Sequence, residues 1–482
     1  MTSVADPFRR VEALDDLAFF REELYACLDA RSDELFELVE AALCTPGAVR
    51  SLVDLALSPE HRRGHGALYD GINAGRIEVG RLSMLVAGMP IPKAADGRIV
   101  LGCDVSNWLR PGAGCSPERL FCHVYGRGKG NAQMIPGWPY SVIAALESGR
   151  TSWTTVLDAV RLGPTDDVAE TTAVQLRQVV ERLIGLGHWR PGDKDILIVL
   201  DAGYDIPRLA FVLADLPVEV LGRLRSDRVF CFPAVNVYNP RGGRPAVHGP
   251  VFALSDDATH PDPAVTTITE TTRYGTATAT SWDRLHPRLA HRTCWLDHEG
   301  PLPVIAGTII QLEVDHLPGD RNPKPIWLWV SMIQATAADV DRWWQSYLRR
   351  FDLEHTFRMW KQTLGWTRPK LRDPAAADRW TWLIIAAHTQ LRLARHLVDD
   401  LRHPWEKPAA PGRLTPARVR RGFRNIRPML PLPASAPKPS IPGPGRPPGS
   451  RNRRPATHHD VGKTVKRDLT ITEHQASKSQ TG

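Results

Sequence analysis

The sequence predicts an α/β protein of several domains, on three observations. An almost wholly apolar run, DILIVLDAGYD, is typical of a strand buried on both faces of a sheet. Apolar residues recur at helical intervals from Asp15 to Leu43 and again through TDDVAETTAVQLRQVVERLIGLGHW. A long segment rich in Pro, Gly and Thr contains alternating, β-prone stretches and is too long to be a loop. Helices, buried strands and a β-rich segment together indicate the α/β class.

The composition is that of a globular protein with a basic C-terminal end. Apolar residues make up 42% of the 482 residues, and the formal net charge is +8. Between Leu401 and the C-terminus lie 17 Lys and Arg residues against 4 Asp and Glu residues. Such a tail favours a polyanionic partner, DNA or RNA. Neither a secretory signal pattern nor a run of eighteen apolar residues occurs, so we expect a cytoplasmic, nucleoid-associated protein.

The seven cysteines form no CxxC pair. Cys115, Cys122 and His123 are close in sequence, but this spacing without a second ligand pair is a weak zinc signal. We expect reduced, buried thiols.

The chain divides at changes of composition. A helical N-terminal domain could read DNA, although a helical support domain fits equally well. It precedes strands, a long helix, the buried strand, a short helix and a further strand, which is the order of an RNase H-like α/β core. A β-rich insertion follows; then PIWLWVSMI returns to the core before a closing helix that begins near Asp373. The last part is basic and contains ten prolines between Pro428 and Pro455, so we expect it to be partly disordered. The predicted boundaries are 1–95, 96–230, 231–325, 326–405 and 406–482.

The stretch from Asp341 to Trp366 predicts one helix, with no Pro or Gly before Gly365. Four polar residues on it fall within about 60° of one another at about 100° per residue. They are Tyr347, Arg350, Glu354 and Lys361. One carboxylate with two cations and a phenol suits a site that holds a metal and a phosphate together.

Two more carboxylates lie at predicted strand ends, Asp104 in VLGCDVS and Asp201 in LIVLDAG. With Glu354 they could hold two Mg²⁺ ions about 4 Å apart for in-line attack on a phosphodiester. A single Asp at a strand end is more often a turn or helix cap. Asp227 also follows a strand and would replace Asp201 if the sheet order differs. The acids that meet only part of the description are Asp205, Glu313 and Asp315.

Three segments resemble the catalytic blocks of DDE transposases from bacterial insertion sequences, in the group with a β-rich insertion and a YREK signature: DVSNW, LDAGYD and YLRRFDLEHTFRMWKQTLGW. CSPERLFCHVYGRG, RWTWLIIAAHTQLRLARHL and PGPGRPPGSRNRR are similar to a transposase family common in high-GC actinobacteria. The resemblance implies an RNase H-like fold and two Mg²⁺ or Mn²⁺ ions held by Asp104, Asp201 and Glu354. It also implies transposon-end DNA and target DNA as substrates of a synaptic homodimer. On this basis the residues beside the DNA phosphates are Tyr347, Arg350 and Lys361.

Two further DNA contacts are predicted with alternatives. In some relatives a tryptophan ahead of the glutamate helix stacks on a flipped base; here Trp327 and Trp329 share one strand face, although tryptophans in a core strand more often pack. Arg446, in PGRPPGS, could lie in a narrow minor groove, or it could belong to a flexible basic linker.

These observations favour a transposase that cleaves and joins DNA. The alternative is an inactive or host-adopted DNA-binding protein derived from one, against which the intact acidic triad argues. A host nuclease with an RNase H-like core would leave the β-rich insertion unexplained.

Overall fold

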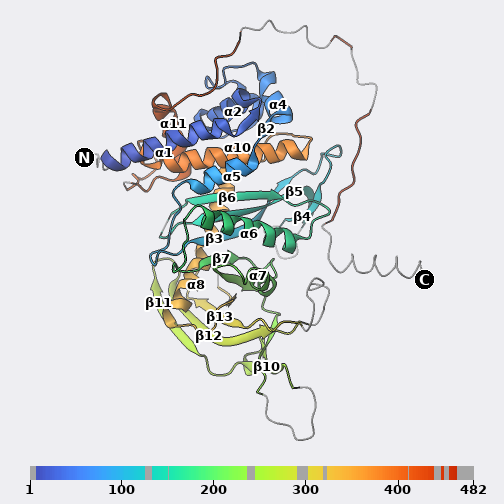
Figure 1. Cartoon of the computed structure of the whole chain (residues 1–482), viewed down its shortest axis with the longest axis vertical. Helices are drawn as coiled ribbons and strands as arrows, with labels where there is room; N and C mark the ends of the chain where they lie inside the picture. Colours follow the sequence, from blue (N-terminus) through green and yellow to red (C-terminus); the bar gives the residue numbers. More distant parts are fainter. Residues whose placement is uncertain are drawn as a thin grey trace, which may run out of the picture.

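The computed structural model describes residues 7–124, 133–149, 151–235, 245–289, 302–317, 323–410, 412–438, 447–449 and 455–463. A helical domain lies at one end of the molecule, and a long mixed sheet extends from it to the hairpin that contains β10 at the other end (Figure 1).

The helical domain is assembled from both ends of the chain. Its elements are α1 (Pro7–Ala26), β1 (Leu28–Ala30), α2 (Ser32–Cys44), α3 (Leu52–Ala56), α4 (His65–Ala74), β2 (Arg76–Ile77), α5 (Val79–Gly88), α10 (Pro374–Leu393) and α11 (Pro416–Ile426). Every residue of α10 from Trp380 to Leu393 is buried, as expected for a helix that is apolar on nearly all sides. It packs against α1, α2, α4 and α11, so the closing helix of the sequence forms the centre of this domain. Among the described helices, none is long and apolar enough to cross a membrane.

The described part of the chain forms one large sheet of twelve strands. They are β3 (Val100–Leu109), β4 (Leu120–Val124), β5 (Gln133–Leu146), β6 (Thr154–Arg161), β7 (Ile196–Leu200), β8 (Val218–Leu224), β9 (Val229–Pro233), β10 (His248–Ala253), β11 (Val265–Thr271), β12 (Gly275–Pro287), β13 (Gly307–Val314) and β14 (Ile326–Val330). The order is β10-β9-β12-β13-β14-β8-β7-β3-β5-β4, with β11 beside β12 and β6 beside β5. β3, β7 and β8 are parallel to one another, and the other strand pairs are antiparallel.

Helices cover both faces of the middle of this sheet. α6 (Val168–Gly185) and α7 (Ile206–Val212) pack on one face, and α8 (Ala337–Arg349) and α9 (Phe351–Gln362) pack on the other. β7 is therefore buried along its whole length, which explains its uninterrupted apolar sequence. The predicted α/β class is confirmed, and the large mixed sheet is consistent with an RNase H-like fold.

The strands between residues 231 and 325 continue the core sheet. β13 pairs with β14, and β14 pairs with β8, each in antiparallel register. The inserted strands thus extend the sheet from its β8 side and do not form a separate layer, while PIWLWVSMI supplies β14 as predicted.

The structure divides the helix predicted from Asp341 to Trp366 into α8 and α9, which meet at Arg350. The amide of Arg350 donates to the carbonyl of Tyr347, and the amide of Leu353 donates to the carbonyl of Arg350. These i to i−3 bonds form a tighter turn than an α-helix. α8 can then pack on β7 and β8 while α9 packs on β3 and β6, because a straight helix could not follow both parts of a twisted sheet.

Part of the Pro-rich chain beyond α11 packs on the helical domain, although the sequence predicts disorder there; this holds for the described residues 428–438. Arg21 donates to the carbonyl of Pro431, and Arg62 donates to the carbonyl of Ala434. Arginine donors from α1 and from the loop between α3 and α4 thus bind carbonyls of a Pro-rich segment, in which few backbone amides are available as donors.

Several cations of the basic C-terminal part are neutralised inside the molecule. The ion pairs are Arg418–Asp400, Arg421–Glu406, Arg424–Glu60 and Arg427–Glu40. The charge counted along this part of the sequence therefore overstates the charge that is free to meet a polyanion.

We predict that the buried imidazole of His388 makes the stability of the protein depend on pH. It lies in α10 between the rings of Trp153 and Trp360. Burial lowers the pKa of His388 from 6.5 to about 4, although its hydrogen bond with the carbonyl of Thr154 acts in the opposite direction. Because the folded state binds this proton more weakly, the contribution is complete above about pH 6.5. It is lost as the pH falls toward 4, by about 3 kcal/mol.

Urea unfolding of the wild type, His388→Gln and the exposed-site control His403→Gln between pH 7 and pH 4 measures this effect. His388→Gln should flatten the dependence of the unfolding free energy on pH, whereas His403→Gln should retain it. Identical pH dependence in all three proteins would contradict the prediction.

The position at which the C-terminal part is truncated should decide whether the helical domain survives. Ending the chain after Asp400 removes the buried side chains of Val419, Phe423 and Ile426, at a cost of about 4 kcal/mol or more. Ending it after Lys438 keeps them. Thermal unfolding of the two proteins should therefore show a large loss of Tm only for the shorter one, and equal Tm values would refute the assignment of α11 to the domain.

Candidate functional site

The two aspartates predicted at strand ends lie beside each other. Asp104 belongs to β3 and Asp201 directly follows β7, and these parallel strands pair with Gly102 opposite Val199. Two residues further along each strand, the same register brings Asp104 level with Asp201. The site thus lies where β7 ends, at the carboxyl edge at which open α/β sheets bind ligands.

Arg350 connects both carboxylates from the turn between α8 and α9. Its Nη1 lies 2.6 Å from Oδ2 of Asp104, and its Nη2 lies 3.4 Å from Oδ2 of Asp201. The guanidinium is almost wholly buried, at 5% exposure for the residue. From the last turn of α8, the hydroxyl of Tyr347 donates to Oδ1 of Asp201 at 3.3 Å. One planar group with two donor edges therefore holds both acids in a fixed relation.

Burial and mutual repulsion determine the charge state of this cluster. Burial raises the pKa of Asp104 to about 6; Arg350 opposes the rise, whereas Glu354 and Asp201 add to it. Burial also raises the pKa of Tyr347 to about 12, and the charge of Asp201 contributes, so the phenol remains protonated and can donate. For Arg350, burial acts against the charged form, but Asp104 and Asp201 raise its pKa above the ordinary value. The site thus contains more negative charge than it can solvate, and it favours a cation.

Glu354 and Lys361 complete the group on α9. Glu354 is exposed and close enough to Asp104 to affect its pKa. Burial lowers the pKa of Lys361, while the charges of Glu354 and Asp104 act to raise it. The ammonium also lies 5.8 Å from the centre of the Trp366 ring. The structure therefore brings all four predicted helix residues to the two aspartates, although they come from two helices.

The donor set fits a divalent ion in its chemistry and only partly in its arrangement. Arg350 pairs with both Asp104 and Asp201, so the two carboxylates are close enough for a single metal cation to neutralise both. Carboxylate oxygens are also the ligands that Mg²⁺ and Mn²⁺ prefer. Within the described ranges, no group of three or more His, Cys, Asp or Glu side chains lies close enough to hold a metal. Glu354 would have to turn toward the aspartates to become a third ligand.

The predicted aromatic contacts do not join this site. Trp327 is 4% exposed and packs among Phe252, His260 and Trp282. Trp329 is wholly buried. Neither ring offers a free face for a base, so the packing alternative describes them. Arg446 lies outside the described residues.

A neighbouring arginine was missed by sequence reasoning. The parallel register of β7 and β8 pairs Leu200 with Gly222, so Arg223 is the residue level with Asp201. Arg223 is exposed, and its charge opposes the burial that raises the pKa of Tyr347. The signal in the sequence was the alternation of arginines after the strand, in GRLRSDR.

The rival acid Asp227 lies beyond β8, exposed in the turn before β9. It has no ion pair within the described part of the chain and does not contribute to the pKa shifts of Asp104, Tyr347 or Arg350. The sheet order places Asp201, and not Asp227, beside Asp104.

Residues 23–288 match the family described as DDE superfamily endonuclease. This segment covers more than half of the 482-residue chain and contains both aspartates, and it ends before α8 begins. The family match thus supports the DDE resemblance over the first part of the core, while the helices that carry Tyr347, Arg350, Glu354 and Lys361 lie beyond it. A search of curated proteins gave no match.

We predict that Arg350→Met destabilises the folded protein by about 3 kcal/mol, because it leaves two partly buried carboxylates without their partner. Combining it with Asp104→Asn should restore much of the lost stability, because Asp201 then has no second carboxylate beside it to repel it. Arg177→Met, which breaks an exposed ion pair with Asp215, should cost less than about 1 kcal/mol. Urea unfolding of the single and double variants gives the coupling energy, and strictly additive effects of Arg350→Met and Asp104→Asn would show that the bridge is unimportant.

Proposed function

This chain belongs to the DDE superfamily endonucleases, and from that membership we propose that it is a transposase. It would cut DNA strands at transposon ends in a reaction that depends on a divalent metal, and join the freed ends to target DNA. The substrates would be terminal inverted repeats, held together by two copies of the chain.

The observation that carries the proposal is the position of Asp104 and Asp201 side by side on adjacent parallel strands. Glu354 is close enough that its charge raises the pKa of Asp104. These three acids are the residues that would hold the metal. When bound, Mg²⁺ or Mn²⁺ would activate the attacking oxygen and stabilise the leaving oxygen of a phosphodiester.

The cations around the acids suit the phosphate backbone. Lys361 and the exposed Arg223 flank the carboxylates from α9 and from β8. Their charges would position the strand so that the scissile phosphate lies at the acids. In the free protein, Arg350 would neutralise Asp104 and Asp201. When a bound metal neutralises these carboxylates instead, the guanidinium would be free to donate to a phosphate.

The phenol of Tyr347 has an orienting role in this proposal. It donates to one oxygen of Asp201, so it fixes the rotation of that carboxylate and leaves the other oxygen directed at Arg350. A protonated phenol is required, which agrees with a pKa raised to about 12. The tyrosine is 2% exposed, so this role suits it better than direct contact with DNA.

The test is nicking of duplex DNA that carries the sequences flanking the reading frame, with Mg²⁺ or Mn²⁺ added. Asp104→Ala, Asp201→Ala and Glu354→Ala should each reduce nicking by roughly a thousandfold or more, while DNA affinity changes only a few-fold. Asp227→Ala is the matched control and should nick at the wild-type rate. Thermal unfolding of each variant excludes loss of the fold as the cause.

Two outcomes would overturn this assignment. Full nicking by Asp201→Ala would remove the aspartate from the site. Metal-independent DNA binding by the wild type, with no nicking under any condition, would instead identify an inactive or host-adopted DNA-binding protein.

A further inference from the structure

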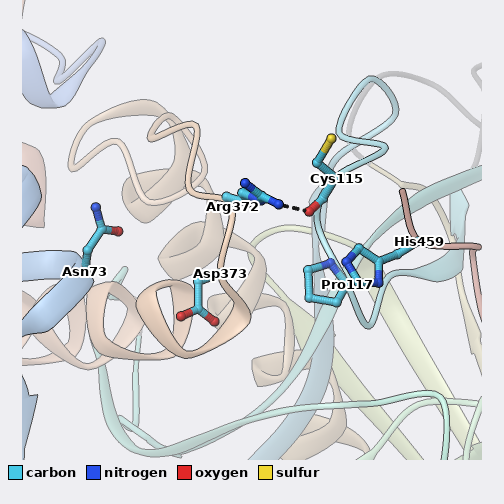
Figure 2. A pocket seen from close by; sticks show the side chains of 6 residues that line it. All are labelled: Asn73, Cys115, Pro117, Arg372, Asp373 and His459. Carbon is cyan, nitrogen blue, oxygen red and sulfur yellow. Dashed lines mark hydrogen bonds between the residues drawn. The ribbon is translucent and has the colours of Figure 1, made fainter. Parts of the chain in front are cut away.

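A cavity of about 440 Å³ lies away from Asp104 and Asp201, where four distant parts of the chain meet. Its lining residues are Asn73, Cys115, Pro117, Arg372, Asp373 and His459. Figure 2 shows Arg372 reaching toward Cys115, with His459 beside Pro117 and with Asn73 on the opposite side. The walls thus come from α4, from the loop between β3 and β4, from the residues before α10 and from the C-terminal segment.

The C-terminal segment is fixed in this wall by backbone hydrogen bonds. The amide of His459 donates to the carbonyl of Gly114, and the amide of Gly462 donates to the carbonyl of Arg119. Gly462 also forms a parallel bridge with Leu120, at the start of the edge strand β4. Residues that follow the basic, Pro-rich part of the chain therefore return to the core and close one side of the cavity.

Two arginines without acidic partners lie directly behind the lining. Arg119, 4% exposed, donates to the carbonyls of Ser116, Arg110 and His459. Arg110 donates to the carbonyl of Leu371 and to the hydroxyl of Ser116. Among the described residues, neither guanidinium has a carboxylate within 4 Å. Burial lowers the pKa of Arg110, and the nearby charge of Arg119 lowers it further.

Among the described residues, the buried Arg392 and Arg420 likewise donate to backbone carbonyls, whereas other buried arginines pair with acids. Arg21 pairs with Glu40, and Arg98 pairs with Glu219. Uncompensated buried charge is costly, and an anion that reaches it would lower that cost. The carboxylate in the lining, that of Asp373, accepts the amide of Ala375 and thereby caps α10. Positive charge therefore dominates around the cavity.

We propose that this cavity binds a phosphate group of the DNA backbone, in the duplex that flanks the cleaved position. The exposed guanidinium of Arg372 makes the direct contact, while Arg110 and Arg119 attract the phosphate through their uncompensated charge. The cavity lies at the β4 side of the sheet, and Cys122 of β4 is near enough to Lys361 to affect it electrostatically. The proposed path of the duplex therefore runs from Lys361 along the β4 side of the sheet to Arg372. This inference rests on the proposed function, because it takes DNA as the substrate.

The first experiment measures the salt dependence of binding of the full-length protein to duplex DNA. Arg372→Ala should lower the affinity about tenfold and reduce the slope of log K against log salt by about 0.9, the value for one lost phosphate contact. Arg372→Lys should keep the slope, since it keeps the charge. The matched control is Arg190→Ala, which removes an exposed arginine in the loop between α6 and β7 and should leave both quantities unchanged.

The second experiment locates the contact with the thiol of Cys115. Cys115 is half-exposed, whereas the other cysteines of the described segments are buried. In a Cys294→Ser background, bound duplex should slow maleimide labelling of Cys115 several-fold, and Arg372→Ala should reduce this protection. Inorganic phosphate alone is the second probe; equal protection by free phosphate would indicate a small-anion site and overturn the assignment to DNA.

The outcomes separate this inference from the proposed function. Suppose that the wild-type protein nicks DNA, that Arg372→Ala and Arg190→Ala bind DNA with the same slope of log K against log salt, and that bound duplex does not slow the labelling of Cys115. The phosphate site is then refuted, while the proposed transposase function is retained. If the wild type shows neither salt-dependent binding nor nicking, the proposed function fails, and this inference fails with it.

Discussion

The double ion pair of Arg350 is the interaction on which the rest of the site depends. Parallel pairing of β3 with β7 brings two carboxylates to the same level, where they would repel each other in a partly buried position. A guanidinium can meet both because its donors lie on two edges of one plane. To reach them, Arg350 must lie above the gap between the strands, and the helices α8 and α9 meet at that point. Gly102 in β3 eases the close approach of α9: a Cβ there would lie 3.0 Å from Cδ1 of Leu353, so the leucine side chain would have to shift.

Most of the site could be predicted from the sequence, for reasons that the structure makes plain. Helical spacing grouped Tyr347, Arg350, Glu354 and Lys361. The grouping survives the break between the helices, since each of the four side chains still contacts or electrostatically affects Asp104 or Asp201. The break itself had no local signal, since neither Pro nor Gly occurs there; it follows from the twist of the sheet below. Arg223 was missed because strand register, which a single sequence does not contain, makes it the neighbour of Asp201. The tryptophans Trp327 and Trp329 could not be judged from spacing alone, since both faces of β14 are covered.

The C-terminal part shows why a charge count is a weak guide to binding. Its excess of Lys and Arg predicted a polyanion-binding tail, but four of these arginines pair with acids that lie nearby in the fold. Two of those acids come from the N-terminal part of the chain: Glu40 lies in α2, and Glu60 lies in the turn between α3 and α4. A pair such as Arg427–Glu40 joins residues that are almost the whole chain apart, so nothing in the local sequence indicates it. The same contacts explain why the helical domain requires both ends of the chain.

The helical domain and α9 are also joined physically, which limits how the protein can move. The amide of Val49, between α2 and α3, donates to the carbonyl of Thr363 at the end of α9. Gly365 follows with φ of +71°, and a Cβ there would lie 2.8 Å from both Cγ1 and the carbonyl oxygen of Val49, so glycine is required by conformation and by space. Next along the chain, the indole of Trp366 donates to Thr381 in α10 and lies under the ammonium of Lys361. Whatever displaces the helical domain therefore acts through Val49 and α10 on the end of the helix that carries Glu354 and Lys361. The position of the helical domain and the position of Glu354 are thus coupled, because one short segment of chain belongs to both.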